Sequence, residues 1–73
     1  MANETHVPDA EGYVHTYNED GELVRIEWPD RWVQYYKNGE HVRTESPIGR
    51  VYHYKNDRLT RTEWPNWKVV TYD

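Results

Sequence analysis

The feature that most constrains this chain is an internal repeat with a period of eighteen residues. When the sequence is shifted by eighteen and compared with itself, several kinds of residue recur in register. These columns are Arg25, Arg43 and Arg61; Glu27, Glu45 and Glu63; Pro29, Pro47 and Pro65; Val33, Val51 and Val69; and Tyr36, Tyr54 and Tyr72. A fixed period marks a chain built from one small structural unit that packs against its own copies. We therefore predict three and a half copies of one unit.

Each unit has the residue pattern of a β-hairpin. Asn38-Gly39 is a strong hairpin signal, because a type I′ turn needs two positive φ angles that Asn and Gly tolerate. The other turns begin with proline, which suits the second position of a type I turn. The runs between turns are rich in Val, Thr, Tyr, Trp and Ile, which favour strands, and no window has a helical period. The predicted fold is all-β, an antiparallel meander of about seven short strands in a single sheet, near residues 12–17, 22–28, 31–37, 40–46, 49–55, 58–64 and 67–72.

Turn length determines which residues share a face, because directly paired residues point to the same side of a sheet. Two-residue turns at the Asn-Gly and proline positions predict that Tyr36 lies opposite His41 and Ile26 opposite Val33. These pairs place an almost uncharged set of Val, Thr, Ile and Trp side chains on one face. The other face is then expected to carry a row of tyrosines, a row rich in arginine and a row rich in glutamate.

The predicted apolar face needs a cover, because one layer of sheet cannot leave its apolar side in water. The sheet can curl into a half-barrel or a closed barrel with a filled interior. Alternatively, two chains can pack face to face as a dimeric sandwich. Residues 68–72 would also form a bare edge that invites pairing with another chain. We therefore expect a homo-oligomer.

Length and composition narrow the class of protein. The 73 residues suit one domain, predicted at residues 12–73 and preceded by a flexible tail at residues 1–11. The absence of cysteine removes disulfides and thiolate metal sites. A formal charge of −4 disfavours nucleic acid as a partner. No apolar run reaches membrane-spanning length and no signal peptide is visible, so we expect a cytoplasmic protein without a membrane partner.

The sequence contains no arrangement typical of catalysis. Ser46 is the only serine, and the predicted register places His53 about 13 Å away from it along the strands. The four histidines do not cluster, and the glutamates recur with the repeat, as a solvated ladder would. No glycine-rich phosphate loop is present. We expect a protein that is not an enzyme and that holds no cofactor and no metal.

The residues from Tyr17 to Asp30, which read YNEDGELVRIEWPD, resemble the YD repeat of Rhs toxins and teneurins. Residues 54–65 and the terminal Tyr72-Asp73 repeat the likeness, and residues 35–39, which read YYKNG, are similar to MORN-like YwqK repeats. The resemblance covers residues 12–73 and implies a hairpin fold with a non-catalytic role. In YD-repeat proteins such hairpins build large spiralling shells, whereas this chain has a shorter period and too few units to enclose anything.

The predicted face of tyrosines and arginines is the remaining candidate for function. Tyr, Trp and Arg dominate binding hot spots, although tyrosines also stabilise sheets by simple cross-strand packing. We predict a binding site formed by Trp32, Tyr36, Arg43, Tyr52, Tyr54 and Arg61. Three functions fit such a site: a protein-binding module, such as a small adaptor or inhibitor; a carbohydrate-binding module whose rings serve as sugar platforms; and a structural repeat that assembles with itself.

Overall fold

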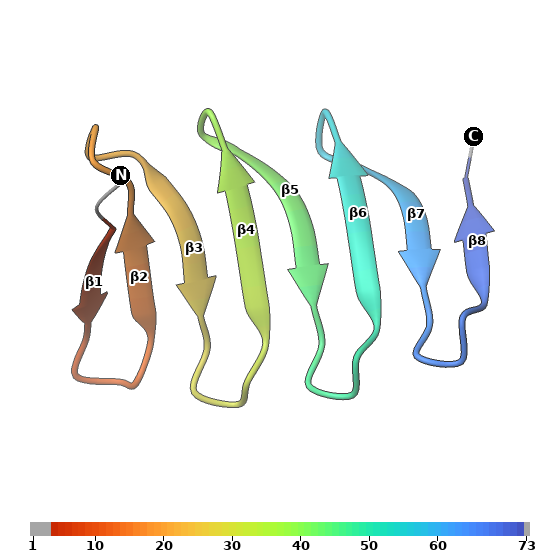
Figure 1. The fold of residues 1–73 in the computed structure, drawn as a ribbon, viewed down its shortest axis with the longest axis horizontal. Coiled ribbons are helices and arrows are strands. Elements are labelled where there is room, and N and C mark those ends of the chain that lie inside the picture. The colour runs from red at the N-terminus through yellow and green to blue at the C-terminus, as the bar shows by residue number, and fades with distance from the viewer. Residues whose placement is uncertain (1–3, 73) are drawn as a thin grey trace.

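The structure, a computed structural model, describes residues 4–72, which form one antiparallel sheet whose eight strands follow each other in sequence order (Figure 1). The predicted all-β meander is confirmed. The strands are β1 (Thr5–Pro8), β2 (Val14–Tyr17), β3 (Leu23–Glu27), β4 (Val33–Lys37), β5 (Glu40–Glu45), β6 (Val51–Lys55), β7 (Arg58–Glu63) and β8 (Val69–Thr71). In the described part of the chain, β1 pairs only with β2 and β8 only with β7, so the sheet is open rather than closed into a barrel.

The first strand lies inside the segment that the sequence analysis assigned to a tail. Strand β1 pairs with β2, with Val7 opposite His15. The side chain of Asp9 closes this hairpin, because its Oδ1 accepts hydrogen bonds from the backbone N–H groups of Glu11 and Tyr13. Such a local side-chain turn needs no hydrophobic signal in the sequence. The sheet therefore has eight strands rather than seven, and residues 1–3 of the predicted tail lie outside the described residues.

The Asn-containing turns have the predicted length. Asn38 and Gly39 have φ angles of 52° and 79°, and the turn places Tyr36 opposite His41. Asn56 and Asp57 repeat this geometry one unit later, with φ angles of 53° and 63°. Both are two-residue turns of the type I′ kind, whose twist matches that of the strands they join.

The proline turns are one residue longer than predicted. The N–H of Trp28 donates to the carbonyl oxygen of Trp32 at 2.8 Å, which encloses three residues rather than two. The third residue of each loop is left-handed, with φ angles of 75° at Arg31, 92° at Gly49 and 67° at Trp67. A two-residue type I turn would splay the strands, and the extra left-handed residue restores their twist. The predicted pair of Ile26 with Val33 is therefore wrong.

A second single-residue shift occurs within three of the strand pairs, β2–β3, β4–β5 and β6–β7. Tyr36 pairs with His41 but Tyr35 pairs with Arg43, so Val42 is an extra residue in β5. Val24 in β3 and Thr60 in β7 are extra in the same way. A bulge of this kind bends the strand that carries it and increases the local twist. Figure 1 shows this bend, since β3, β5 and β7 curve where β2, β4 and β6 run nearly straight.

These shifts redistribute the side chains between the two faces, because a slip of one residue turns a strand's side chains over. The predicted uncharged face does not form. The first observed face, which we call the aromatic face, contains Val7, Tyr13, His15, Tyr17, Leu23, Ile26, Trp28, Trp32, Gln34, Tyr36, His41, Thr44, Arg50, Tyr52, Tyr54, Leu59, Thr62, Trp64, Lys68, Val70 and Tyr72. The second, the ion-pair face, contains Thr16, Arg25, Tyr35, Arg43, His53, Arg61 and Thr71 beside Val14, Glu27, Val33, Glu45, Val51, Glu63 and Val69.

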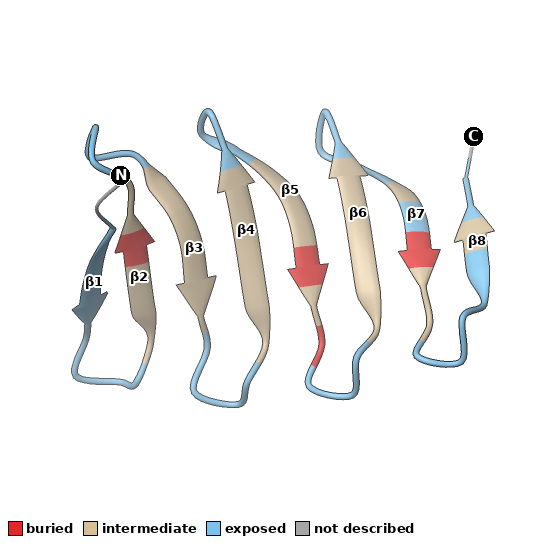
Figure 2. Ribbon diagram, in the orientation of Figure 1, coloured by how far each residue is buried: buried red, intermediate tan, exposed pale blue. Residues whose placement is uncertain are grey.

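The single layer leaves the chain without an apolar core. Among the described residues no hydrophobic side chain is buried, and the buried residues are Thr16, Thr44, Ser46 and Thr62 (Figure 2). The radius of gyration is 13.5 Å, whereas a compact domain of this length has a radius of about 11 Å. Internal stability must therefore come from backbone pairing and from contacts between side chains on neighbouring strands.

Substitutions at the second residue of the two Asn turns, which is Gly39 in one and Asp57 in the other, test the geometry of these turns. We expect Asp57→Gly to stabilise the protein and Gly39→Asp to destabilise it, each by about 1 kcal/mol, because glycine adopts positive φ without strain. No atom lies within 4 Å of a Cβ added at Gly39, so the effect there is one of backbone conformation alone. Urea denaturation followed by circular dichroism measures both changes. Equal signs for the two variants would contradict the assignment of both turns to type I′.

Substitutions of two threonines on opposite faces test the observed strand register. Thr62 is 2% exposed on the aromatic face, whereas Thr71 is exposed and lies opposite Arg61 on the ion-pair face. We expect Thr62→Asp to cost roughly 2–4 kcal/mol, because it buries a carboxylate without a partner. Thr71→Asp should change stability by no more than about 0.5 kcal/mol. Thermal denaturation of the two variants side by side checks this, and similar losses would mean that the faces are misassigned.

Candidate functional site: the aromatic face

The aromatic face brings together rings from most of the hairpins. Tyr13 and Trp28 meet edge to face with ring centroids 5.4 Å apart, and Trp32 stacks on Tyr52 across two strands at 6.5 Å. Alternate residues of a strand point to the same side, so the sequence places these rings at every second position. Aromatic pairs in these geometries contribute about 0.5–1.5 kcal/mol each beyond the area they bury. The rings therefore form a connected surface rather than isolated exposed residues.

His41 lies at the centre of this surface. Its ring is 5.5 Å from the ring of Tyr36 and 4.4 Å from that of Tyr54, which joins β4, β5 and β6. Its Nε2 lies 2.6 Å from the Thr44 hydroxyl oxygen and 3.1 Å from the Arg43 carbonyl oxygen. Because Thr44 is buried, these contacts hold the imidazole in one orientation between the two tyrosines.

A shallow pocket of about 350 Å³ opens beside this histidine. Its lining consists of Trp28, Asp30, Trp32, Gln34, His41, Thr44 and Tyr54. The Gln34 side-chain oxygen accepts a hydrogen bond from the Trp28 indole N–H at 3.2 Å and another from the Tyr36 hydroxyl at 3.4 Å. These bonds fix the indole at the rim of the pocket, so the pocket is formed before any ligand arrives.

The C-terminal half of the face contains a cation over a ring. The guanidinium carbon of Arg50 lies 3.8 Å from the ring centroid of Trp64, and its Nη1 donates to the Tyr52 hydroxyl at 3.0 Å. A guanidinium over an indole contributes about 0.5–1 kcal/mol at an exposed site and more where water is excluded. Arg50 is therefore part of the aromatic surface, with its guanidinium packed over the Trp64 ring.

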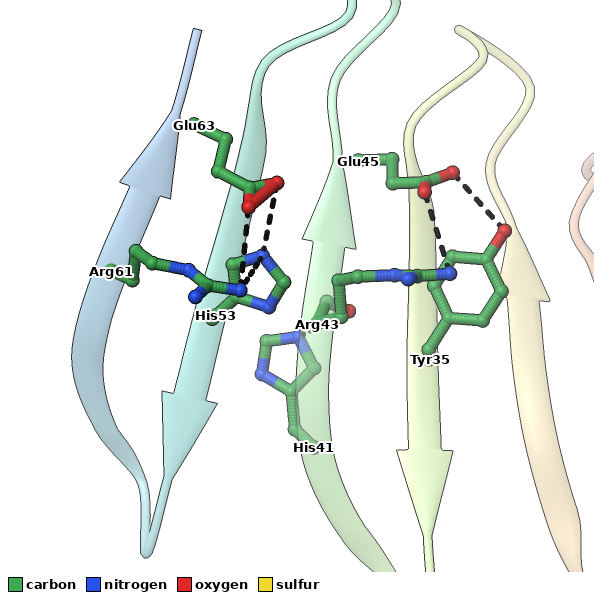
Figure 3. A network of polar contacts seen from close by, with 7 residues as sticks. All are labelled: Tyr35, His41, Arg43, Glu45, His53, Arg61 and Glu63. Carbon is green, nitrogen blue, oxygen red and sulfur yellow. Dashed lines mark hydrogen bonds and ion pairs between the residues drawn. The ribbon is translucent and has the colours of Figure 1, made fainter. Parts of the chain in front are cut away.

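The ion-pair face has a different chemistry, shown in Figure 3. Arg43 pairs with Glu45 at 3.4 Å and lies over the ring of Tyr35, whose hydroxyl donates to the same carboxylate at 3.1 Å. One repeat later Arg61 and His53 lie 3.3 and 3.4 Å from the Glu63 carboxylate. The ion pairs are partly exposed, so each contributes about 0–1 kcal/mol.

The structure separates the six residues of the predicted binding site. Trp32, Tyr36, Tyr52 and Tyr54 lie together on the aromatic face. Arg43 and Arg61 lie on the opposite face, where carboxylates already pair with them. The predicted site of tyrosines and arginines on one face is therefore divided between two faces with separate chemistry, and Arg43 lies over the ring of Tyr35 on the ion-pair face.

Five of the seven residues that line the pocket lie outside the predicted binding site: Trp28, Asp30, Gln34, His41 and Thr44. The predicted two-residue proline turns place Trp28 on the apolar face and His41 among the tyrosines of the other face, so these two residues were not expected to meet. The signal that could have found them is Gly49, which directly follows Pro47-Ile48 and marks a three-residue loop with a left-handed third position. That loop length places Trp28, Gln34 and His41 on one face.

Residues 4–72 offer little support for other kinds of site. They contain no group of three or more His, Asp or Glu side chains that could hold a metal ion. No helix in this part of the chain is long and apolar enough to cross a membrane. The aromatic face is therefore the candidate functional site.

No family model, no curated protein and no solved structure matches this chain. The resemblance to YD-repeat and YwqK-type repeats therefore stays a prediction, and the function rests on the two faces of the sheet.

Proposed function

We propose that the chain is a non-catalytic protein-binding module and that the aromatic face takes the partner. One observation carries the proposal: large apolar rings gather on one side of a single-layer sheet, and none of them is buried by the described chain. Contiguous exposed apolar surface on a small protein marks an interaction site. Tyr and Trp rings are also the side chains that contribute most to protein interfaces.

Side chains of the aromatic face are already held in place before binding, which also favours this proposal. His41 is held by Thr44, and the Trp28 indole is held by Gln34, before a partner arrives. Side chains that are already fixed lose little conformational entropy on binding, so more of the interaction energy remains as affinity. Tyrosine and tryptophan also keep a polar group at the edge of the ring, which can bond to a partner.

The ion-pair face is less suited to binding a partner, which supports the assignment of binding to the aromatic face. Its arginines and glutamates pair with each other within one strand, as Arg25 does with Glu27 at 3.1 Å. A partner would have to break or desolvate these pairs, which costs free energy unless it replaces every contact. The paired charges also keep that side of the sheet compatible with water. We therefore assign binding to the aromatic face and solubility to the ion-pair face.

Two double variants compare the faces directly. The first step identifies a protein that the wild-type chain captures from a host lysate. The affinity of that protein is then measured for two double variants, Trp32→Ala/Tyr54→Ala and Arg43→Ala/Arg61→Ala. We expect the aromatic pair of substitutions to weaken binding by about thirtyfold or more, as for hot-spot residues. The arginine variant should bind about as well as the wild type.

Circular dichroism and thermal denaturation of both variants show whether each still folds. If the arginine variant loses the partner while the folded aromatic variant keeps it, the binding face has been assigned to the wrong side of the sheet.

The pocket beside His41 favours a second candidate function, carbohydrate binding. Two indoles border it, and the carboxylate of Asp30 is exposed at its rim. Its volume of about 350 Å³ lies at the small end of ligand sites, which suits one or two sugar rings. Indole faces pack against the apolar side of a sugar, and the carboxylate can accept bonds from its hydroxyl groups.

Titration with soluble oligosaccharides, followed by tryptophan fluorescence, tests this second candidate. A saturable change is expected for a matching sugar, and Trp32→Ala should abolish it because that indole lines the pocket. Trp67→Ala is the matched control, since Trp67 is 92% exposed and lies outside this pocket. A sugar response that survives Trp32→Ala, or the absence of any response up to millimolar sugar, argues against a carbohydrate site here.

A further inference from the structure

We propose that the partner that covers the aromatic face is a second copy of this chain, so that two sheets pack face to face around a two-fold axis. This inference rests on the proposed function, since it uses the same face, and it names the partner. A two-fold interface presents the same patch from both subunits, so one self-complementary face is enough to form it. Two sheets packed in this way enclose a core about 10 Å thick.

The exposed area of the single chain carries the argument. The chain exposes 5691 Å², whereas a compact monomer of 8.9 kDa exposes roughly 4,800 Å². The surplus of about 900 Å² matches the roughly 800 Å² per partner that a standard stable interface buries. Covering the aromatic face once would therefore remove the surplus.

The two edges of the sheet are poorer places for a second copy. Asp9 donates its N–H to the Tyr13 carbonyl oxygen, and hydrogen-bonded pairs alternate along an antiparallel ladder. Pro8 therefore directs its nitrogen, which has no hydrogen, away from β2 and toward the open edge. Proline at that position blocks further pairing.

At the other edge, β8 spans only Val69–Thr71, and few of its backbone groups point outward. A copy that joined there would also leave both broad faces of the sheet uncovered. Growth of the sheet from either edge is therefore disfavoured relative to stacking on the aromatic face.

Charge also distinguishes the faces. The ion-pair face carries the three Arg–Glu pairs, which two copies would have to desolvate in order to stack there. On the aromatic face the charged residues are Arg50 and Lys68, toward the proline turns, and Asp30 at the rim of the pocket, and the face also carries the histidines His15 and His41. The guanidinium of Arg50 already lies over the Trp64 ring, so a second copy that covers this face would not bury the charge without a partner. The centre of the aromatic face around Ile26, Thr44 and Tyr52 is uncharged.

The first experiment measures assembly with the unmodified chain. Sedimentation velocity over a wide concentration range should show one species of twice the 8.9 kDa chain mass. The melting temperature should rise with chain concentration, because association stabilises only the folded form. A folded monomer at every concentration, or an assembly that keeps growing, would overturn the proposal.

The second experiment identifies the buried face. The chain lacks cysteine, so single-cysteine variants report on one position each. Leu59→Cys lies on the aromatic face and Val69→Cys on the ion-pair face, and the native side chains are 37% and 53% exposed. As concentration rises into the dimer range, maleimide labelling of Leu59→Cys should slow by about tenfold. Labelling of Val69→Cys should not change.

The outcomes separate this inference from the proposed function. A dimer that protects Val69→Cys and not Leu59→Cys would overturn the face-to-face arrangement through the aromatic side. A folded monomer whose capture of another protein still depends on Trp32 and Tyr54 would reject the second copy and leave the protein-binding function standing. A face-to-face dimer with no dependence of capture on those residues would support the second copy and reject binding of another protein by that face.

Discussion

Because the chain folds as one layer of sheet, most of its physical properties depend on contacts between neighbouring strands. A sheet with a helix or a second sheet on one side hides its apolar residues in the space between the layers. Here no such layer exists among residues 4–72, and the buried residues are three threonines and a serine. Cross-strand contacts, such as Trp32 on Tyr52 and His41 on Tyr54, take the place of a core. The same rings that stabilise the sheet are thus the rings that we propose a partner covers.

The separation of the two faces follows from small features of the backbone. Each repeat contains a three-residue loop and a bulge, and each adds one residue to the pairing. Together they bring Arg43 and Glu45 to one side of β5 and His41 and Thr44 to the other. Without them, charged groups and rings would mix on both faces. The repeated pairs of charges then lie on one face, while the rings gather on the other.

Binding and stability are linked in a protein of this shape. A domain of this size buries only about 60% of its unfolded surface even when it is compact, and this chain buries less than a compact domain would. Any partner on the aromatic face would add the missing burial, so association would stabilise the fold as well as create a complex. The fixed positions of His41 and Trp28 then serve both purposes, because they order the surface before contact.

The sequence alone determined the strands and the turns that have a strong local signal. The eighteen-residue period, the β-forming runs and Asn38-Gly39 identify an antiparallel meander and fix the pairing of Tyr36 with His41. Only the tertiary structure decided the bulges, the added strand β1 and the length of the proline loops at Arg31 and Trp67, where no glycine marks the left-handed position as Gly49 does in the loop between them. Side chains alternate with a period of two residues, so one extra residue moves Arg43 and Arg61 to the face opposite Tyr36 and Tyr54. Local sequence identifies a turn, but the twist of the paired strands selects its length, and that selection decides which residues meet.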